Sequence, residues 1–296
     1  MTATTDDTYA LLDSGNGRKL ERFGACTLAR PCSQAIWRPR CPEAAWQAAD
    51  ASFDREEGQR WHNRGRLPEE WIIAVDGLRF RLSGTDFGHL GIFPEQRANW
   101  RWLGAAVRGA ARAGRRDVGV LNLFAYSGGA TLAAAAAGAA VCHVDASAGM
   151  VQWARDNAAL NGLADAPVRW IVDDVHKFLG REIKRGRRYD AVVLDPPSFG
   201  RGAQGEVYKF ERDVPRTLEL CRRLLADPPL AVLLSAHTPG ITPTTLAHLL
   251  ADALPAGRIE SGEMLLTGAD GARPVPNGCF ARWGTPVIDT AGDALR

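Results

Sequence analysis

Apolar runs alternate with helical segments along the chain from Arg97 onward. Five such runs stand in the segments VGVLNLF, AAVCHVD, VRWIVD, YDAVVLD and LAVLLSA. Uninterrupted apolar runs between helices are typical of parallel strands that are covered on both faces. The pattern therefore predicts a buried parallel sheet. Two more strands, RIESGEMLL and CFARWG, are joined by the loop TGADGARPVPNG and are expected to close one edge of the sheet as a hairpin.

The residues before Arg97 follow a different pattern. Short extended pieces such as YALL, CTLARP, WIIAV and LRFRL are separated by turn residues, including DG and SG. This pattern favours antiparallel hairpins. The charged, Trp-containing stretch from Pro39 to Pro68 predicts loop and short helix. We therefore expect a small β-rich module over residues 1–96 and an α/β domain over residues 97–296.

Composition narrows the class of protein. The 296 residues are 46% hydrophobic and 24% charged, as in globular proteins. The longest low-charge stretch, Gly128 to Cys142, is shorter than the roughly 18 apolar residues of a membrane span, and the start MTATTDD lacks the basic residues of a signal peptide. The six cysteines form no CxxC, and no His and Cys spacing suggests zinc. We expect a cytoplasmic protein with reduced thiols, without membrane or metal partners.

Three strand ends carry residues that suit an adenosine ligand. The first strand runs into two adjacent glycines before a helix, the second ends in an aspartate, and the third ends in two aspartates and a valine. Glycines permit close approach of the backbone, and an acidic residue after the second strand suits ribose hydroxyls. The candidate cofactor residues are Asn122, Ala125, Tyr126, Ser127, Gly128, Gly129, Asp145, Ala146, Ser147, Asp173, Asp174 and Val175.

The motifs for bound phosphate are missing from these strand ends. The chain has neither GxGxxG nor GK[ST] here, so an adenosine ligand without phosphate fits better. The alternative is that the glycines only permit tight packing and that the aspartates are turn or cap residues.

The fourth strand, YDAVVLD, delivers DPPS and then Phe199 to the same edge of the sheet. The two prolines fix the turn, so the Asp195 carboxylate and the Pro196 carbonyl can together hold an exocyclic amine while Phe199 stacks on its ring. An ordinary turn is the alternative. The candidate substrate-binding residues are Pro197, Ser198, Lys209 and His237. Lys209 could instead pair with a neighbouring glutamate, and His237 could be structural.

Together these segments resemble a known family. The run LNLFAYSGGATLAAAAAGAAVCHVDAS, the tetrad DPPS with Phe199, and GIFPEQRANW are similar to class I S-adenosylmethionine-dependent methyltransferases. More narrowly, the stretch from Gly88 to Trp283 resembles the bacterial family that includes the large-subunit ribosomal RNA cytosine-C5 and guanine methyltransferases. The resemblance implies a Rossmann-like, seven-stranded, mostly parallel sheet with a reversed last strand, and S-adenosylmethionine as cofactor. It also implies that Asp195 contributes to the cofactor site.

The same resemblance places Phe93, Gln96 and Arg97 beside the cofactor. A surface arginine at a helix start is the alternative for Arg97. In the C5 members a cysteine lies just past strand five, because a thiolate must add to carbon 6 before carbon 5 can be methylated. Here Ala236 stands at that position. This departure argues against C5 chemistry, and we expect Cys279, near another strand, to be structural.

The function expected from these residues is methylation of a base in ribosomal RNA, at an exocyclic or ring nitrogen. A small-molecule methyltransferase and a cofactor-binding RNA scaffold without turnover are the alternatives. The net charge of +2 does not decide between them. The basic run Arg181–Arg188 and the arginines at positions 108, 112, 115 and 116 are either RNA contacts or solvated faces. The sequence leaves the oligomeric state open.

Overall fold

The computed structural model describes residues 8–54, 60–201, 205–268 and 271–284. They form two compact units. The first unit contains the described residues up to Arg97 together with Met264–Asn277, and the second contains Ala98–Glu263 and the described residues from Gly278 on. We expected a single boundary between residues 96 and 97. In the structure, a C-terminal segment also belongs to the first unit. Within the described ranges, no helix is both long and apolar enough to cross a membrane.

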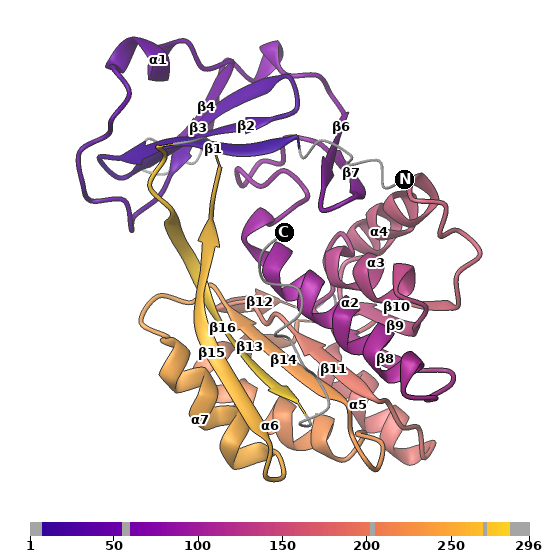
Figure 1. The fold of residues 1–296 in the computed structure, drawn as a ribbon. Coiled ribbons are helices and arrows are strands. Elements are labelled where there is room, and N and C mark those ends of the chain that lie inside the picture. Colours follow the sequence, from indigo (N-terminus) through magenta and orange to yellow (C-terminus); the bar gives the residue numbers. More distant parts are fainter. Residues whose placement is uncertain (1–7, 55–59, 202–204, 269–270, 285–296) are drawn as a thin grey trace. The chain divides into compact units, whose positions relative to one another are not determined.

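The first unit is built on a five-stranded sheet of order β1-β2-β3-β4-β5, with a separate hairpin β6–β7 (Figure 1). Its elements are β1 Tyr9–Gly15, β2 Arg18–Phe23, β3 Cys26–Pro31, α1 Glu43–Gln47, β4 Ala51–Asp54, β5 Arg60–His62, η1 Arg64–Arg66, β6 Trp71–Val75, β7 Leu78–Leu82 and η2 Pro94–Gln96. β3 and β4 pair in parallel, and the other neighbours pair antiparallel. β4 and β5 lie in the stretch where loop and short helix were expected.

The hairpin β6–β7 turns at Asp76 and Gly77, which both have positive φ, 52° and 75°. Such a pair is what a tight two-residue hairpin turn requires. The DG break in the sequence therefore predicted this turn correctly.

The segment 264–277 packs on the first strand of the same unit. The Leu11 amide donates to the Thr267 carbonyl at 3.3 Å. A Cβ at Gly268 would lie 2.1 Å from the Leu11 nitrogen, so only glycine allows this approach.

The second unit contains a seven-stranded sheet of order β10-β9-β8-β11-β14-β16-β15. Its elements are α2 Arg97–Arg112, β8 Gly119–Leu123, α3 Gly129–Ala136, β9 Ala140–Asp145, α4 Ala148–Leu160, β10 Val168–Val172, α5 Val175–Lys184, β11 Ala191–Leu194, β12 Phe199–Arg201, β13 Val207–Lys209, α6 Phe210–Arg222, β14 Ala231–Ala236, α7 Pro243–Ala253, β15 Arg258–Leu266 and β16 Val275–Gly284. Strands β8 to β11 and β14 pair in parallel, whereas β16 runs antiparallel to β14. The predicted Rossmann-like sheet with a reversed last strand is confirmed.

Successive residues of the central strands enter two different cores. Leu121 and Leu123 of β8 pack with helices α5, α6 and α7, whereas Val118 and Val120 pack with α2 and α3. β11 and β14 divide in the same way. A strand buried on both faces is apolar at most positions, which explains the apolar runs. Because β8, β9, β10 and β11 pair in parallel, their carboxyl ends lie at one edge of the sheet (Figure 1).

Candidate active site

The loop between β8 and α3 has a backbone that is set before any ligand binds. Phe124 and Tyr126 both have positive φ, 55° and 50°, which is uncommon for residues with bulky side chains. The buried Asn157 of α4 donates its side-chain nitrogen to the Ser127 carbonyl at 3.0 Å. The fold therefore holds the loop in a conformation that the isolated sequence would rarely adopt.

Asp145, the last residue of β9, is held by backbone amides on both oxygens. Tyr126 donates to Oδ2 and Ser147 to Oδ1, each at 2.9 Å. Burial raises the pKa of this carboxyl, and the two amide hydrogen bonds oppose that effect. Each carboxylate oxygen keeps a second lone pair, so the group can still accept hydrogen bonds from two hydroxyls. This pair of acceptor oxygens fits the ribose of an adenosine ligand.

The two glycines of the loop have packing reasons of their own. Gly128 has φ of 94° and is the N-cap of α3. A Cβ at Gly129 would lie 2.4 Å from the Trp100 ring, and one at Gly128 would lie 3.0 Å from Ala154 Cβ. Tight packing, the alternative raised from the sequence, therefore accounts for Gly129.

Asn122 of β8 belongs to a buried polar chain. Its side-chain nitrogen donates to the Thr131 hydroxyl, which in turn lies 2.9 Å from His143 Nδ1. Burial, together with repulsion from Arg155, lowers the pKa of His143 to about 3, so the ring is neutral. The Asn122 side chain thus ties β8 to α3 and β9 beneath the loop.

The three candidate cofactor residues after β10 have different roles in the structure. Asp174 caps α5 by accepting from the Lys177 amide at 2.9 Å, and the Val175 side chain is buried in the core. Asp173 donates its amide to the Asp145 carbonyl at 3.0 Å, while its carboxylate contacts Arg181. Of the two aspartates, Asp173 is therefore the one whose backbone is hydrogen-bonded to the end of β9.

The turn after β11 places Asp195 within reach of β14. Ser235 donates its hydroxyl to Asp195 Oδ1 at 2.7 Å, and His237 Nδ1 lies 3.5 Å from the same oxygen. Pro196 is buried. The structure thus brings the predicted residues Asp195 and His237 together, and it adds Ser235, which the sequence reasoning had passed over.

Ser198 and Phe199 follow the two prolines of this turn, and both side chains are exposed. Thr238 donates to the Ser198 hydroxyl at 2.9 Å. Phe199 is exposed and pairs with Lys209 in the short β12–β13 hairpin. The expected alternative for Lys209, an ion pair with Glu206 or Glu211, is not seen among the described residues, and Glu206 contacts Lys177 instead.

Ser235 and Thr238 carried a signal that sequence reasoning could have used. They stand in LLSAHT, where a hydroxyl interrupts an apolar strand just before its end. A buried hydroxyl needs a partner, and the neighbouring parallel strand ends in Asp195. That register, Leu194 opposite Leu234, could not be read from the sequence alone.

Phe93, Gln96 and Arg97 belong to the first unit, whereas the strand ends described above belong to the second. The Gln96 amide donates to the Phe93 carbonyl at 3.0 Å, and the Arg97 guanidinium lies 5.6 Å from the centre of the Tyr9 ring. Their place beside the cofactor remains a prediction.

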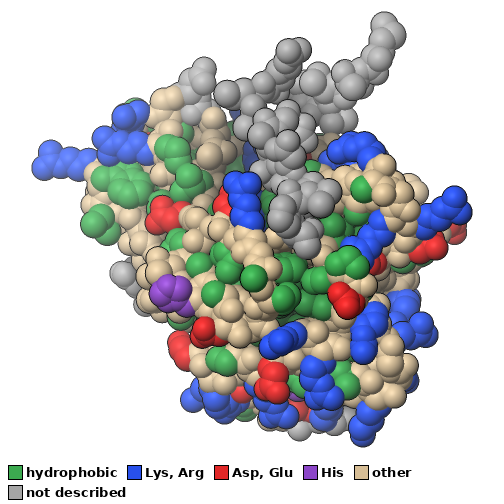
Figure 2. Space-filling model, turned by 60° about the horizontal axis from the view of Figure 1, so that its bottom comes forward, with side chains coloured by type: hydrophobic (Ala, Val, Ile, Leu, Met, Phe, Trp, Pro, Cys, Tyr) green, Lys and Arg blue, Asp and Glu red, His purple; other side chains and the backbone are tan. Residues whose placement is uncertain are grey.

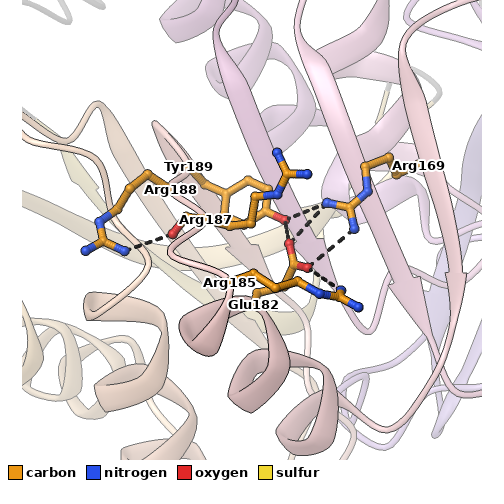
Figure 3. A network of polar contacts seen from close by, with 6 residues as sticks. All are labelled: Arg169, Glu182, Arg185, Arg187, Arg188 and Tyr189. Carbon is orange, nitrogen blue, oxygen red and sulfur yellow. Dashed lines mark hydrogen bonds and ion pairs between the residues drawn. The ribbon is translucent and has the colours of Figure 1, made fainter.

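The basic run Arg181–Arg188 is partly engaged inside its own unit. Arg181 contacts Asp173, and Arg185 donates to Glu182 at 3.1 Å (Figure 3). Lys and Arg side chains stand among acidic ones over the lower part of the face in Figure 2. A solvated face therefore explains much of this charge.

A sequence model of the S-adenosylmethionine-dependent methyltransferases matches residues 51–260, well over half of the chain. The chain belongs to this family. S-Adenosylmethionine is accordingly its cofactor, as the sequence predicted, and Asp145 with the amides around it fits the adenosine part. Among the described residues, no group of three or more His, Cys, Asp or Glu is placed to hold a metal ion.

Solved structures support the fold and the family. A methyltransferase dependent on S-adenosylmethionine from Agrobacterium tumefaciens is 41% identical, with a TM-score of 0.87 over 94% of this chain and 90% of that one. A Streptococcus mutans protein described as a methyltransferase of the same cofactor is 19% identical, with a TM-score of 0.72 over 94% and 75% of the two chains. The second likeness shows the fold alone.

Curated relatives are similar over a shorter stretch. Ribosomal RNA large subunit methyltransferase K of Neisseria meningitidis is 30% identical over 59% of this chain and 48% of its own length. Ribosomal RNA large subunit methyltransferase I of Shewanella denitrificans is 35% identical over 56% of this chain and 40% of its own. The chain thus spans less than half the length of these two relatives.

Proposed function

We propose that this methyltransferase modifies a base in ribosomal RNA, at an exocyclic or ring nitrogen. The observation that carries the proposal is the Asp195 carboxylate, which accepts from the Ser235 hydroxyl at 2.7 Å and stands four residues before Phe199. A fixed acceptor next to an exposed aromatic ring suits a heterocycle that bears an amine. The names of the Neisseria and Shewanella relatives support ribosomal RNA as the carrier of that base.

S-Adenosylmethionine supplies a methyl group that is already activated on a sulfonium. The protein therefore needs chiefly to position the acceptor. In the proposal, Asp195 and the Pro196 carbonyl accept the two protons of the amine and turn its lone pair toward the methyl group. The methylated nitrogen carries one proton too many, and the Asp195–His237 pair is placed to receive it. RNA as partner and a cytoplasmic location belong to the same proposal.

The test is to map methylated nucleotides in total RNA from cells with and without the gene. One modified nucleoside is expected to disappear from ribosomal RNA and to return with the wild-type gene, but not with Asp195→Asn. Purified protein should restore the same nucleotide in RNA from the deletion strain. Unchanged RNA in both experiments, with a methylated metabolite lost instead, would establish the small-molecule alternative. Binding of cofactor and RNA without any methylated product would establish the scaffold.

A further inference from the structure

A short hairpin, β12–β13, follows directly on the acceptor turn. Phe199 pairs with Lys209, Gly200 with Tyr208, and the next residue of β12 with Val207. Directly opposed residues share a face of a hairpin, and neighbours along a strand point to opposite faces. Phe199, Lys209 and Val207 therefore share an outer face, while Tyr208 lies on the inner face.

The inner face is fixed by a saturated hydrogen-bond network. The Thr217 hydroxyl donates to the Asp213 carbonyl at 2.8 Å, which uses its only proton. The Tyr208 hydroxyl, 3.1 Å away, and His176 Nε2, 2.8 Å away, must therefore both donate to Thr217. The Tyr208 ring also meets the Phe124 ring edge-on at 4.9 Å. The inner face thus joins the hairpin to α5, α6 and the cofactor loop.

The backbone of the hairpin is anchored as well. The Lys209 amide donates to Asp213 Oδ2 at 2.7 Å, and the Phe210 amide donates to the Ser198 carbonyl at 3.2 Å. Strand β13 and the acceptor turn are therefore tied to the start of α6. The outer face is presented by a preorganised element.

The outer face is apolar and basic at once. The Phe199 side chain is 52% exposed and Val207 is 40% exposed, and the Lys209 side chain is exposed beside them. Single exposed apolar residues are ordinary, but two on an anchored hairpin that also carries a cation form a defined surface. Unpaired nucleotides are bound by side chains that contact the face of the base, aromatic rings above all, together with a cation that pairs with the phosphate.

We infer that the outer face of β12–β13 receives the unpaired base next to the target base, with Val207 under that base and Lys209 at its phosphate. This inference rests on the proposed function and narrows the substrate to a target in an unpaired stretch of RNA. A base pair would keep the neighbouring base in the helix, out of reach of Val207.

The experiment compares Val207→Ser with Leu265→Ser, since Leu265 is also 40% exposed but stands on β15. Fluorescence anisotropy with saturating S-adenosylhomocysteine would measure binding of a labelled single-stranded 15-mer RNA and of its duplex. Val207→Ser removes apolar contact with the base, so it should weaken single-strand binding about fivefold and leave duplex binding unchanged. Leu265→Ser should change neither. Val207→Trp, which offers a larger stacking surface, should tighten single-strand binding.

The outcomes separate the two proposals. If the wild type methylates ribosomal RNA but Val207→Ser and Val207→Trp both bind the single strand as Leu265→Ser does, the hairpin inference is wrong and the proposed function stands. If the wild type, folded and bound to S-adenosylhomocysteine, methylates no RNA, the proposed function is wrong. Melting temperatures of the variants should match the wild type, because exposed substitutions of this kind cost little stability.

Discussion

Cys279 on β16 stands directly opposite Ala236 on β14, in the last register pair of these antiparallel strands. The cysteine nearest the position where C5 enzymes carry their nucleophile is therefore on the neighbouring strand. Its side chain is buried, and its Sγ donates to the Ile241 carbonyl at 3.6 Å. Burial and the negative charge of Glu263 raise the pKa of Cys279 to about 11. Near neutral pH the group is a thiol rather than a thiolate.

The first prediction is that the protein forms no covalent adduct with RNA that contains 5-fluorocytosine, because no thiolate is available to add to carbon 6. Denaturing gel electrophoresis after incubation with S-adenosylmethionine would check this. Cys279→Ser should methylate at the wild-type rate. A stable protein–RNA band that vanishes in Cys279→Ser would restore C5 chemistry.

The second prediction concerns Asp145. Asp145→Ala removes the proposed acceptor of both ribose hydroxyls and should lose about 2 kcal/mol of affinity for S-adenosylhomocysteine in isothermal calorimetry. Asp174→Ala is the matched change at the next strand end. It removes a helix cap and should lower the free energy of unfolding by about 1 kcal/mol while cofactor affinity holds. Equal cofactor affinities of wild type and Asp145→Ala would exclude Asp145 from the site.

Much of the α/β unit could be predicted because its strands are buried on both faces. The run VGVLNLF is apolar except for Asn122, since Leu121 and Val120 enter different cores. β4 and β5 escaped prediction because they have only four and three residues, and because β4 pairs with residues distant in sequence, as Ala51 does with Leu28. Nothing local in RWH distinguishes such a strand from a loop.

The residues of the candidate site likewise fall into those that the sequence could predict and those that it could not. Asp145 and Asp195 could be found because they end apolar strands, and strand ends meet at one edge. The partners of Ser235 and Tyr208 could not be predicted, because they depend on strand register and on the packing of α6. The role of Gly129 was open for a similar reason: its neighbour Trp100 comes from another helix.

The third prediction follows from Glu182, which is fully buried and accepts from Arg169, Arg185 and the Tyr189 hydroxyl (Figure 3). Burial alone would raise the pKa of this carboxyl, but the hydrogen bonds, with that from Arg169 the largest, hold it at about 2, below its usual 4.5. A depressed pKa in the folded state stabilises the protein above the unfolded value, and this contribution is lost as the pH falls from about 4.5 toward 2.

Glu182→Gln should therefore lower the free energy of unfolding by about 2 kcal/mol at pH 7, and the difference from wild type should shrink as the pH falls below about 4.5. Urea denaturation at a series of pH values would measure this. Glu219→Gln, an exposed change on α6, should have almost no effect at any pH. A pH-independent difference for Glu182→Gln would show that the carboxylate charge is not what stabilises the network.

The last prediction concerns which basic side chains contact the phosphates of RNA. Lys209 stands exposed beside Phe199, whereas Arg181 and Arg185 of the basic run already contact carboxylates. Each phosphate that a cation neutralises releases counterions, so the logarithm of affinity for a single strand falls with the logarithm of salt at roughly 0.7 per contact. Lys209→Ala should reduce that slope by about one contact, leaving affinity for S-adenosylhomocysteine unchanged. Val207→Ser should weaken binding without altering the slope, because stacking releases no counterions.

Lys184→Ala tests the basic run in the same titration, since Lys184 is an exposed lysine at the end of α5. A slope that falls for Lys184→Ala but not for Lys209→Ala would move the phosphate contact from the hairpin to that helix. Asp195→Ala should abolish methylation and leave the slope as in the wild type, because a carboxylate that orients the target base contributes no phosphate contact. Binding independent of salt in every variant would argue against a phosphate-bearing acceptor and in favour of a small molecule.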